Sequence, residues 1–307
     1  MTSSTWKQRE VLQNLNGRKE LKFMKKIKIT TDTASDISLE TAEKYGIHLL
    51  PINITIDGKA YKDRYDINPE EFYDVLPKCN EIPKTGQVTV SEHMEEFKKF
   101  SDEYAIIHIP ISANASGTYQ SACLAANEIK EENPDADITI VDPASFSYGY
   151  GYYAIEAAKM VQDGKTKEEI IAYLEDGFKH TRIFFAPDTL DYLKKGGRIS
   201  SKAKIIADVL DITPVLAIED GLVMSKDKVR GKKKVMGKIA DMVNEVMDKD
   251  SDQPFVIMHA LDSEKAEKFK QILTEKTGKT EFVTEVLGPT IGIHAGPGAY
   301  GVIFRGK

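Results

Sequence analysis

Small uncharged donors gather in one short stretch of the sequence, SANASGTYQSACLAAN, from Ser112 to Asn127. Ser116, Gly117 and Thr118 stand directly before a helical pattern, and no lysine or acid lies among them. Backbone N–H groups and hydroxyls at the start of a helix donate hydrogen bonds to electron-rich groups. The stretch therefore predicts a binding site for an anion.

Three other polar loops have the same character and stand beside predicted strands or helices. They are TDTASD at 31–36, KTGQVTVSE at 84–92 and GIHAGPGAYG at 292–301. Open α/β sheets gather their ligands at such strand ends. Hydroxyls and an imidazole can close around a carboxylate or phosphate, and glycine lets the backbone approach it. We single out Thr85, Ser116 and His294 as candidate donors.

Each candidate also has a simpler structural interpretation. A serine or threonine before a helix often serves only as an N-cap, and a loop histidine often only makes a local hydrogen bond. Arg198, in KKGGRIS, also fits a solvated charge near a helix end. A functional interpretation therefore depends on the loops meeting in one place.

The overall charge excludes several classes of partner. A formal net charge of -6 gives no basic surface of the kind that nucleic acids or anionic membranes attract. The chain has neither a long apolar run for a membrane segment nor the apolar core of a secretion signal, which predicts a cytoplasmic protein.

Cys79 and Cys123 lack metal-type spacing and are expected to be reduced packing residues. We expect no metal and no cofactor.

The first 23 residues are polar, and MKKIKITTDTASD follows them. We expect residues 1–23 to be an extension outside the domains, with Met24 as the natural start. An ordinary short helix from Trp6 to Leu15 is the alternative.

From Ile27 onward, β-rich runs alternate with helical patterns, which is typical of a layered α/β domain. The expected strands are KIKIT, HLLPINITI, YAIIHIPI (104–111) and DITIV (137–141), and the expected helices are 38–45, 91–100, 118–130 and 150–161. The crossovers fit a parallel sheet. Thr166 and Glu169 have the spacing of a capping box for one more helix.

The pattern changes after Ile183, where most runs are strands. The expected strands are RIFFAP, ITPVLAI, LVMS, PFVIMH, FVTEVL and GVIFR, with helices at 232–247 and 263–276. Asp-Gly within IEDGLV predicts a hairpin and hence antiparallel pairing. We therefore expect two domains, a parallel-sheet α/β/α domain at 24–180 and an α/β domain with a mixed or largely antiparallel sheet at 181–307. A ligand is expected in the cleft between them.

Five motifs in order carry a resemblance to a known family. They are ITTDTASDIS, TGQVTVSE, ISANASGTYQSA, DTLDYLKKGGRIS and LGPTIGIHAGPGAYGV. From Met24 to Lys307 the chain resembles the DegV family of bacterial fatty-acid-binding proteins. The resemblance implies a DegV-like two-domain fold.

The resemblance also implies a function and a set of site residues. A long-chain fatty acid lies in a buried tunnel, and its carboxylate is held by Thr85 and by Ser116 of the Ser-Gly-Thr segment that includes Gly117. His294 lies nearby, and Arg198 is placed at the mouth, with a role in head-group electrostatics or partner docking. Relatives of this kind deliver the fatty acid to a separate fatty acid kinase, which makes an acyl phosphate for phospholipid synthesis. The binding protein itself is then not an enzyme.

The chain departs from the family pattern in two of these motifs. Gly86 and Val88 replace the usual serine and proline, and Ala113 and Asn114 stand where the second serine and its neighbour occur. Hydroxyls are therefore missing from the implied head-group pocket. We expect the ligand to be held less tightly or to differ in kind.

Three other functions compete with this one. A serine hydrolase would use Ser116, His294 and Asp32, but NASGT lacks the first glycine of the G-x-S-x-G pattern. A nucleotide-using kinase would need a phosphate-binding loop, and KKGGRIS has the wrong order for one. A plain interaction module with a vestigial pocket is the third.

Overall fold

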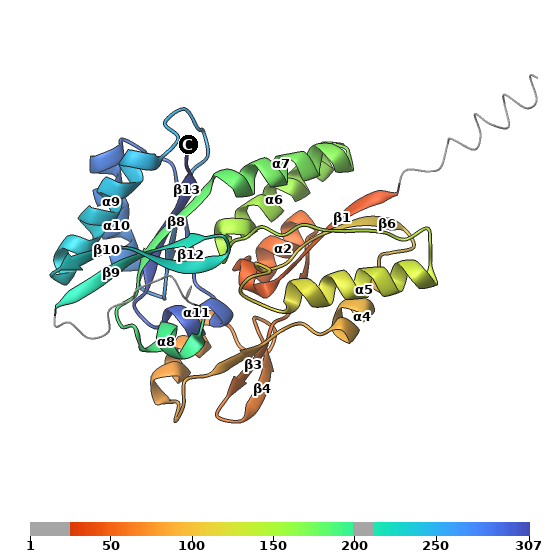
Figure 1. The fold of residues 1–307 in the computed structure, drawn as a ribbon, viewed down its shortest axis with the longest axis horizontal. Coiled ribbons are helices and arrows are strands. Elements are labelled where there is room, and N and C mark those ends of the chain that lie inside the picture. The colour runs from red at the N-terminus through yellow and green to blue at the C-terminus, as the bar shows by residue number, and fades with distance from the viewer. Residues whose placement is uncertain (1–24, 199–210) are drawn as a thin grey trace, which may run out of the picture.

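A computed structural model describes residues 25–198 and 211–307 of the chain. Three β-sheets and the helices between them make up this part of the molecule (Figure 1). The predicted extension at 1–23, the alternative helix at 6–15 and the proposed start at Met24 lie outside the described residues.

The N-terminal part contains a four-stranded parallel sheet, as predicted. The strand order is β2-β1-β6-β7, and every pair is parallel. These strands are β1 (Lys26–Asp32), β2 (His48–Leu50), β6 (Tyr104–Ile109) and β7 (Asp137–Ile140). Residues 105–109 of β6 are all buried, because helices cover both faces of the sheet.

Helices from different parts of the chain form the two covering layers. Ile106 of β6 packs against α4 (Val90–Lys98) and α5 (Thr118–Glu132). Ile107 points to the other side, into the cluster that includes Ala154 of α6 (Tyr148–Gln162). Helix α2 (Leu39–Tyr45) packs against α6, as does α7 (Lys167–His180), which begins with the predicted Thr166–Glu169 capping box.

The C-terminal part is built on a six-stranded mixed sheet with the order β10-β9-β8-β13-β11-β12. Only β11 and β12 pair in parallel among these strands. The strands are β8 (Thr181–Ala186), β9 (Ile212–Glu219), β10 (Leu222–Arg230), β11 (Phe255–His259), β12 (Phe282–Val286) and β13 (Tyr300–Arg305). The predicted Asp-Gly hairpin joins β9 to β10, and Asp220 and Gly221 have φ angles of 48° and 68°, as this turn requires.

Side chains alternate across this sheet and separate two cores. Ile257 and Val302 face the outer side, where they pack with α9 (Val235–Val246) and α10 (Ser263–Thr277). Met258 and Ile303 face the inner side, toward the N-terminal part. The inner face of the sheet is therefore available to line a cavity.

A third, small sheet corrects one prediction. HLLPINITI is not one strand but two, because Pro51 lacks the N–H that a continuous strand would use. After the break, β3 (Asn53–Ile56) pairs with β4 (Lys59–Lys62) and β5 (Lys84–Gly86) in an antiparallel sheet. The strands of this sheet are too short for their periodicity to reveal them.

Short helical segments complete the described structure. They are η1 (Thr33–Ser35), α3 (Pro69–Val75), η2 (Leu76–Lys78), α8 (Asp191–Gly196), η3 (Lys232–Lys234) and α11 (Pro289–Ala295). Helices α8 and α11 contact each other below the six-stranded sheet (Figure 1). The proposed division between domains at 180/181 falls where α7 ends and β8 begins, and it stays a prediction.

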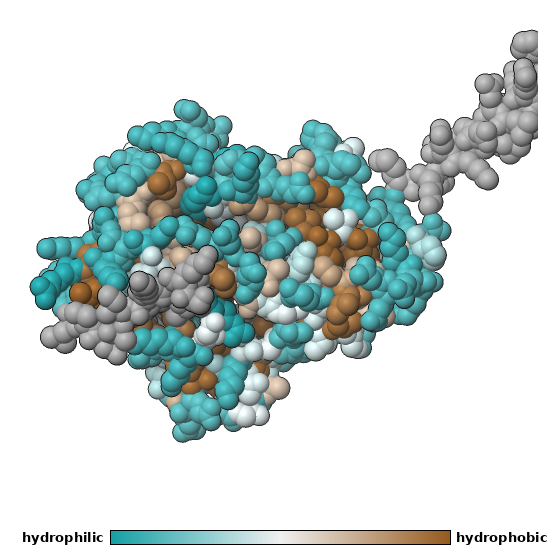
Figure 2. All heavy atoms as spheres, in the orientation of Figure 1, coloured by the Kyte–Doolittle hydropathy of each residue, from teal (hydrophilic) through white to brown (hydrophobic). Residues whose placement is uncertain are grey.

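Hydrophilic residues supply most of the surface on the face drawn in Figure 2, and hydrophobic residues appear there in scattered groups. Cys79 and Cys123 are both free and half-buried. Among the described residues, no helix combines the length and the apolar composition needed to cross a bilayer.

Burial in the outer core predicts different responses for two neighbouring residues of β11 and β12. Ile257 is fully buried in the outer core, so Ile257→Ala should lower the free energy of unfolding by about 2–5 kcal/mol. Its cross-strand partner Thr284 is exposed, so Thr284→Ala should change it by only about 0.5 kcal/mol. Denaturant unfolding measures both, and equal small effects would contradict the assigned core.

Candidate functional site

A cavity of about 300 Å³ lies between the inner face of the six-stranded sheet and the N-terminal part of the molecule. Most of its lining is apolar. The apolar lining residues are Ile52, Ile111, Ala115, Phe146, Ile183, Phe185, Leu193, Ile218, Val223, Met258, Leu287, Ile291, Ala295, Ala299, Tyr300 and Ile303. An apolar cavity with a few polar groups is the usual form of a small-molecule site.

Thr85 and His294 meet at one side of this cavity. Thr85 lies on β5 and His294 on α11, and 209 residues separate them in the sequence. The Thr85 Oγ1 and His294 Nε2 atoms are 3.1 Å apart. The small sheet and the C-terminal helix thus bring two predicted donors into hydrogen-bond contact.

The environment of His294 keeps its imidazole neutral. Burial lowers the pKa of His294 to about 4, and the positive charge of Arg198 acts in the same direction. A neutral imidazole carries one N–H, so the tautomer protonated at Nε2 donates to Thr85 and leaves the threonine proton for a bound anion. Gly196 makes this position possible, since a Cβ there would stand 2.3 Å from His294 Nδ1.

Ser116 lies on the loop between β6 and α5. Its Oγ is 2.9 Å from Thr118 Oγ1 and accepts a hydrogen bond of 3.2 Å from the Thr118 N–H. The hairpin turn of the six-stranded sheet holds this loop from the other side, because Asn114 Nδ2 donates to the Asp220 carbonyl at 2.8 Å. Both parts of the molecule therefore fix the loop.

Gly117 has a packing role beside this serine. A Cβ at Gly117 would stand 2.0 Å from Gln87 Oε1, so any other residue there would displace that side chain. Gln87 Nε2 in turn donates to Ser121 Oγ at 2.8 Å. These contacts join the loop that follows Thr85 to the start of α5.

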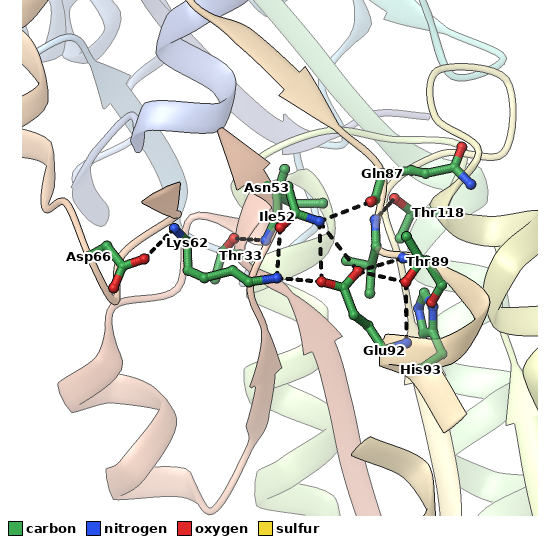
Figure 3. Close-up of polar contacts among 11 residues, drawn as sticks. Thr33, Ile52, Asn53, Lys62, Asp66, Gln87, Thr89, Glu92, His93 and Thr118 are labelled. Carbon is green, nitrogen blue, oxygen red and sulfur yellow. Dashed lines mark hydrogen bonds and ion pairs between the residues drawn. The ribbon is translucent and has the colours of Figure 1, made fainter. Parts of the chain in front are cut away.

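A polar network anchors the small sheet that carries Thr85 (Figure 3). Lys62 of β4 forms an ion pair with Glu92 of α4 and donates to Asn53 Oδ1 at 2.6 Å. Asn53 Nδ2 donates to the Gln87 carbonyl at 3.2 Å. The sheet is thus attached to α4 on the side where β5 ends.

Arg198 links the end of α8 to the Ser116 loop. Its Nε donates to the Ala115 carbonyl at 3.3 Å, and its Nη1 donates to the Gly196 carbonyl at 2.6 Å. A second hollow, of about 450 Å³, shares Thr85, Arg198 and His294 with the cavity and is also lined by exposed lysines, Lys84 and Lys195. Arg198 therefore lies at the boundary between the apolar cavity and the hollow.

All five predicted site residues, Thr85, Ser116, Gly117, Arg198 and His294, line the same cavity. Their contact with a ligand stays a prediction. No group of three or more His, Cys, Asp or Glu side chains within 25–198 and 211–307 is arranged to hold a metal ion.

The sequence analysis missed two buried hydroxyls in the cavity wall, Ser147 and Thr290. Thr290 precedes His294 by four residues and so lies on the same face of α11, a spacing that could have identified it. No sequence pattern identifies Ser147. It precedes α6 with a φ of 54° and a ψ of −146°, which is not the usual conformation of a residue that begins a helix.

The contacts of Ser116, His294 and Asp32 do not form a nucleophilic triad. Ser116 Oγ pairs with Thr118, and His294 Nε2 pairs with Thr85. Asp32 accepts hydrogen bonds from the Tyr150 hydroxyl at 2.6 Å and from the Ile111 N–H at 2.7 Å. The arrangement favours binding of an acid group over a serine relay.

Comparison with known proteins gives matches over nearly the whole described chain. The family model described as "Uncharacterised protein, DegV family" matches residues 26–307. A DegV domain-containing protein of Caldanaerobacter subterraneus subsp. tengcongensis is 36% identical over 285 residues, which cover 92% of this chain and 100% of that protein.

Solved structures give the same result. DegV of Bacillus subtilis, described as a fatty acid binding protein, matches with a TM-score of 0.81 and 29% identity, covering 92% of this chain and 100% of its own. A DegV family protein of Ruminococcus gnavus, refined with vaccenic acid, has a TM-score of 0.82 and 25% identity, covering 91% of this chain and 99% of its own.

The lowered pKa of His294 predicts a pH dependence of stability. Between its ordinary pKa of 6.5 and about 4, the unfolded chain takes up a proton that the folded protein does not. The free energy of unfolding should therefore fall as the pH falls through this window, and it should fall less in His294→Gln. His93 and His108, whose pKa values are also lowered by burial, are present in both proteins. Denaturant unfolding at several pH values measures the difference, and parallel curves would contradict it.

Proposed function

Because this chain belongs to the DegV family, we propose that its cavity binds a long-chain fatty acid and that Thr85 and Ser116 hold the carboxylate. One observation carries the proposal: an apolar cavity ends at uncharged donors, the Thr85–His294 pair and the Ser116 loop. Fatty acid binding by the Bacillus subtilis relative and vaccenic acid in the Ruminococcus gnavus structure support it.

Charges around the cavity favour one orientation of the ligand. Behind Ser147 and Thr290 lie the buried carboxyl groups of Asp36 and Asp63, which disfavour a ligand carboxylate beside them, although the ion pair of Arg64 with Asp36 reduces this repulsion. Thr85, Arg198 and His294 line both the cavity and the hollow. The carboxylate therefore points toward the hollow, and the acyl chain fills the apolar interior.

The two ends of the ligand contribute differently to binding. Burial of about 14 methylenes at roughly 0.8 kcal/mol each gives on the order of 11 kcal/mol. A charge-assisted hydrogen bond adds only about 1.5–3 kcal/mol. The chain supplies most of the affinity, and the head-group donors select the orientation and prevent the cost of an unpaired buried carboxylate.

In this proposal the protein makes no bonds itself but presents the carboxylate to a separate fatty acid kinase. The kinase converts the carboxylate to an acyl phosphate, which enters phospholipid synthesis, and the exchange takes place in the cytoplasm. The hollow outside Thr85, Arg198 and His294 supports this role, since Lys195 in its lining suits an incoming phosphate group, while Lys84 forms an ion pair with Glu81 of the same lining.

Removal of the head-group donors should weaken fatty acid binding without unfolding the protein. Thr85→Val or Ser116→Ala should each cost about 1–3 kcal/mol of binding free energy, because one donor to the carboxylate is lost. Thr55→Val is the matched control, since Thr55 is exposed on β3 and does not line the cavity. Isothermal titration with a long-chain fatty acid measures the change. Undiminished retention of fatty acid by the Thr85/Ser116 double variant would contradict the assignment.

The kinase role has its own test. The protein loaded with a radiolabelled fatty acid is mixed with a fatty acid kinase catalytic protein and ATP, and acyl phosphate is trapped as the hydroxamate. Label should appear in the hydroxamate only when binding protein, kinase and ATP are all present. The label could stay in free fatty acid even though the same kinase acts with another binding protein. This result would refute presentation of the carboxylate to the kinase but not fatty acid binding.

A further inference from the structure

Two residues in the cavity wall use their hydroxyl protons in hydrogen bonds to carboxyl groups that lie behind the wall. Ser147 Oγ donates to Asp36 Oδ2, and Thr290 Oγ1 donates to Asp63 Oδ2. The two hydroxyl residues are only 6% and 4% exposed, and both line the cavity. An ionised carboxylate can only accept, so the hydroxyl is the donor in each pair.

Burial raises the pKa of both carboxyl groups, and the positive charge of Arg64 opposes this shift in each of them. Asp36 also accepts hydrogen bonds from the Gly288 N–H at 2.8 Å and from Arg64 Nη2 at 3.2 Å. Burial raises the pKa of Asp63 to about 6, which still leaves that carboxyl ionised at pH 8. Neither carboxylate is then able to return a proton to its hydroxyl partner.

The hydroxyl oxygens are therefore left as acceptors. A hydroxyl oxygen has two lone pairs, and no hydrogen bond found in the described part of the chain is donated to Ser147 Oγ or Thr290 Oγ1. The two lie near each other, because Asp36 contacts both Ser147 and Gly288, which is two residues from Thr290. One section of the wall thus presents acceptors without donors.

This section of the wall is otherwise apolar. Leu287 and Ile291 flank Thr290 on the lining, and Phe146 precedes Ser147. A plain methylene chain leaves both acceptors unpaired, whereas a hydroxyl on the chain would donate to one of them. A buried hydroxyl without a partner is costly, so the same wall disfavours a hydroxyl placed elsewhere along the chain.

Resting on the proposed function, we infer that the cavity accepts hydroxylated long-chain fatty acids, with the chain hydroxyl donating to Ser147 Oγ or Thr290 Oγ1. Thr290 stands one helical turn, about 6 Å, from His294 at the head-group end. The hydroxyl is therefore near the carboxyl end of the chain rather than at its methyl end. The inferred ligand class is long-chain acids hydroxylated within the first few carbons.

The test compares ligands on the delipidated full-length protein at pH 8 by competition with a fluorescent fatty acid. The ligands are hexadecanoic acid and its derivatives with a hydroxyl on the third carbon, the fifth carbon or the terminal carbon. At least one carboxyl-proximal hydroxy acid should bind as tightly as the parent acid or tighter. The terminal hydroxy acid should bind about tenfold more weakly.

Variants then identify the acceptors. Ser147→Ala with Thr290→Val should lower the affinity for the preferred hydroxy acid about tenfold more than the affinity for the parent acid. Thr31→Val is the control, because Thr31 carries a buried hydroxyl that is absent from the cavity lining and should leave the ratio unchanged.

The outcomes separate the inference from the function on which it rests. Weaker binding of every hydroxy acid by the unmodified protein, whatever the hydroxyl position, would overturn the inference while plain fatty acid binding survives. Equal weakening of hydroxy and parent acids in the double variant would also overturn it. Failure of all the acids to bind would refute the proposed function itself. The ligand series on the unmodified protein decides the matter even where the double variant does not fold.

Discussion

The carboxyl group of Asp36 holds together the walls on which the cavity depends. It accepts hydrogen bonds from Ser147 at the start of α6, from the backbone N–H of Gly288 before α11, and from Arg64 after β4. A Cβ at Gly288 would stand 2.7 Å from Asp36 Oδ1 and from Arg64 Nη2, so glycine is needed for the approach. One buried carboxylate therefore positions α11, and with it His294, relative to the N-terminal part. Burial raises the pKa of Asp36, and the charge of Arg64 and the surrounding donors oppose this shift.

Small residues occur beside these walls, on the inner face of the six-stranded sheet and next to it. Gly301 of β13 lies against Phe185 of β8, where a Cβ would stand 2.7 Å from the phenylalanine Cβ. Ala295 and Ala299 line the same region. On the outer face, large residues such as Phe304 fill the core beneath α9 and α10. The period-two alternation of the strands thus allows one sheet to be close-packed on one side and hollow on the other.

Regular elements could be predicted from the sequence, but the site could not be assembled from it. The parallel sheet, the mixed sheet and the Asp220–Gly221 hairpin follow from local hydrophobic patterns and turn chemistry. The apolar residues around Pro51 predicted one continuous strand, but Pro51 separates β2 from β3. Thr85 and His294 meet across 209 residues, and no spacing rule predicts such a pair. Only the family resemblance grouped the site residues, and it gave no signal for Ser147, whose backbone conformation depends on tertiary contacts.

Under the proposed function, the neutral donors Thr85, Ser116 and His294 affect how readily the protein releases its ligand. A carboxylate paired inside the cavity with a protonated histidine would gain a buried ion pair, and its departure would leave an uncompensated charge. Here burial and Arg198 lower the pKa of His294 to about 4, so at neutral pH the imidazole offers a dipole rather than a charge. Arg198 stands at the boundary with the hollow, where its own carbonyl partners at Ala115 and Gly196 already use part of its donor capacity. Under the proposed function, the acyl chain provides retention and the head group is oriented without a strong ionic bond, which leaves it accessible from the hollow.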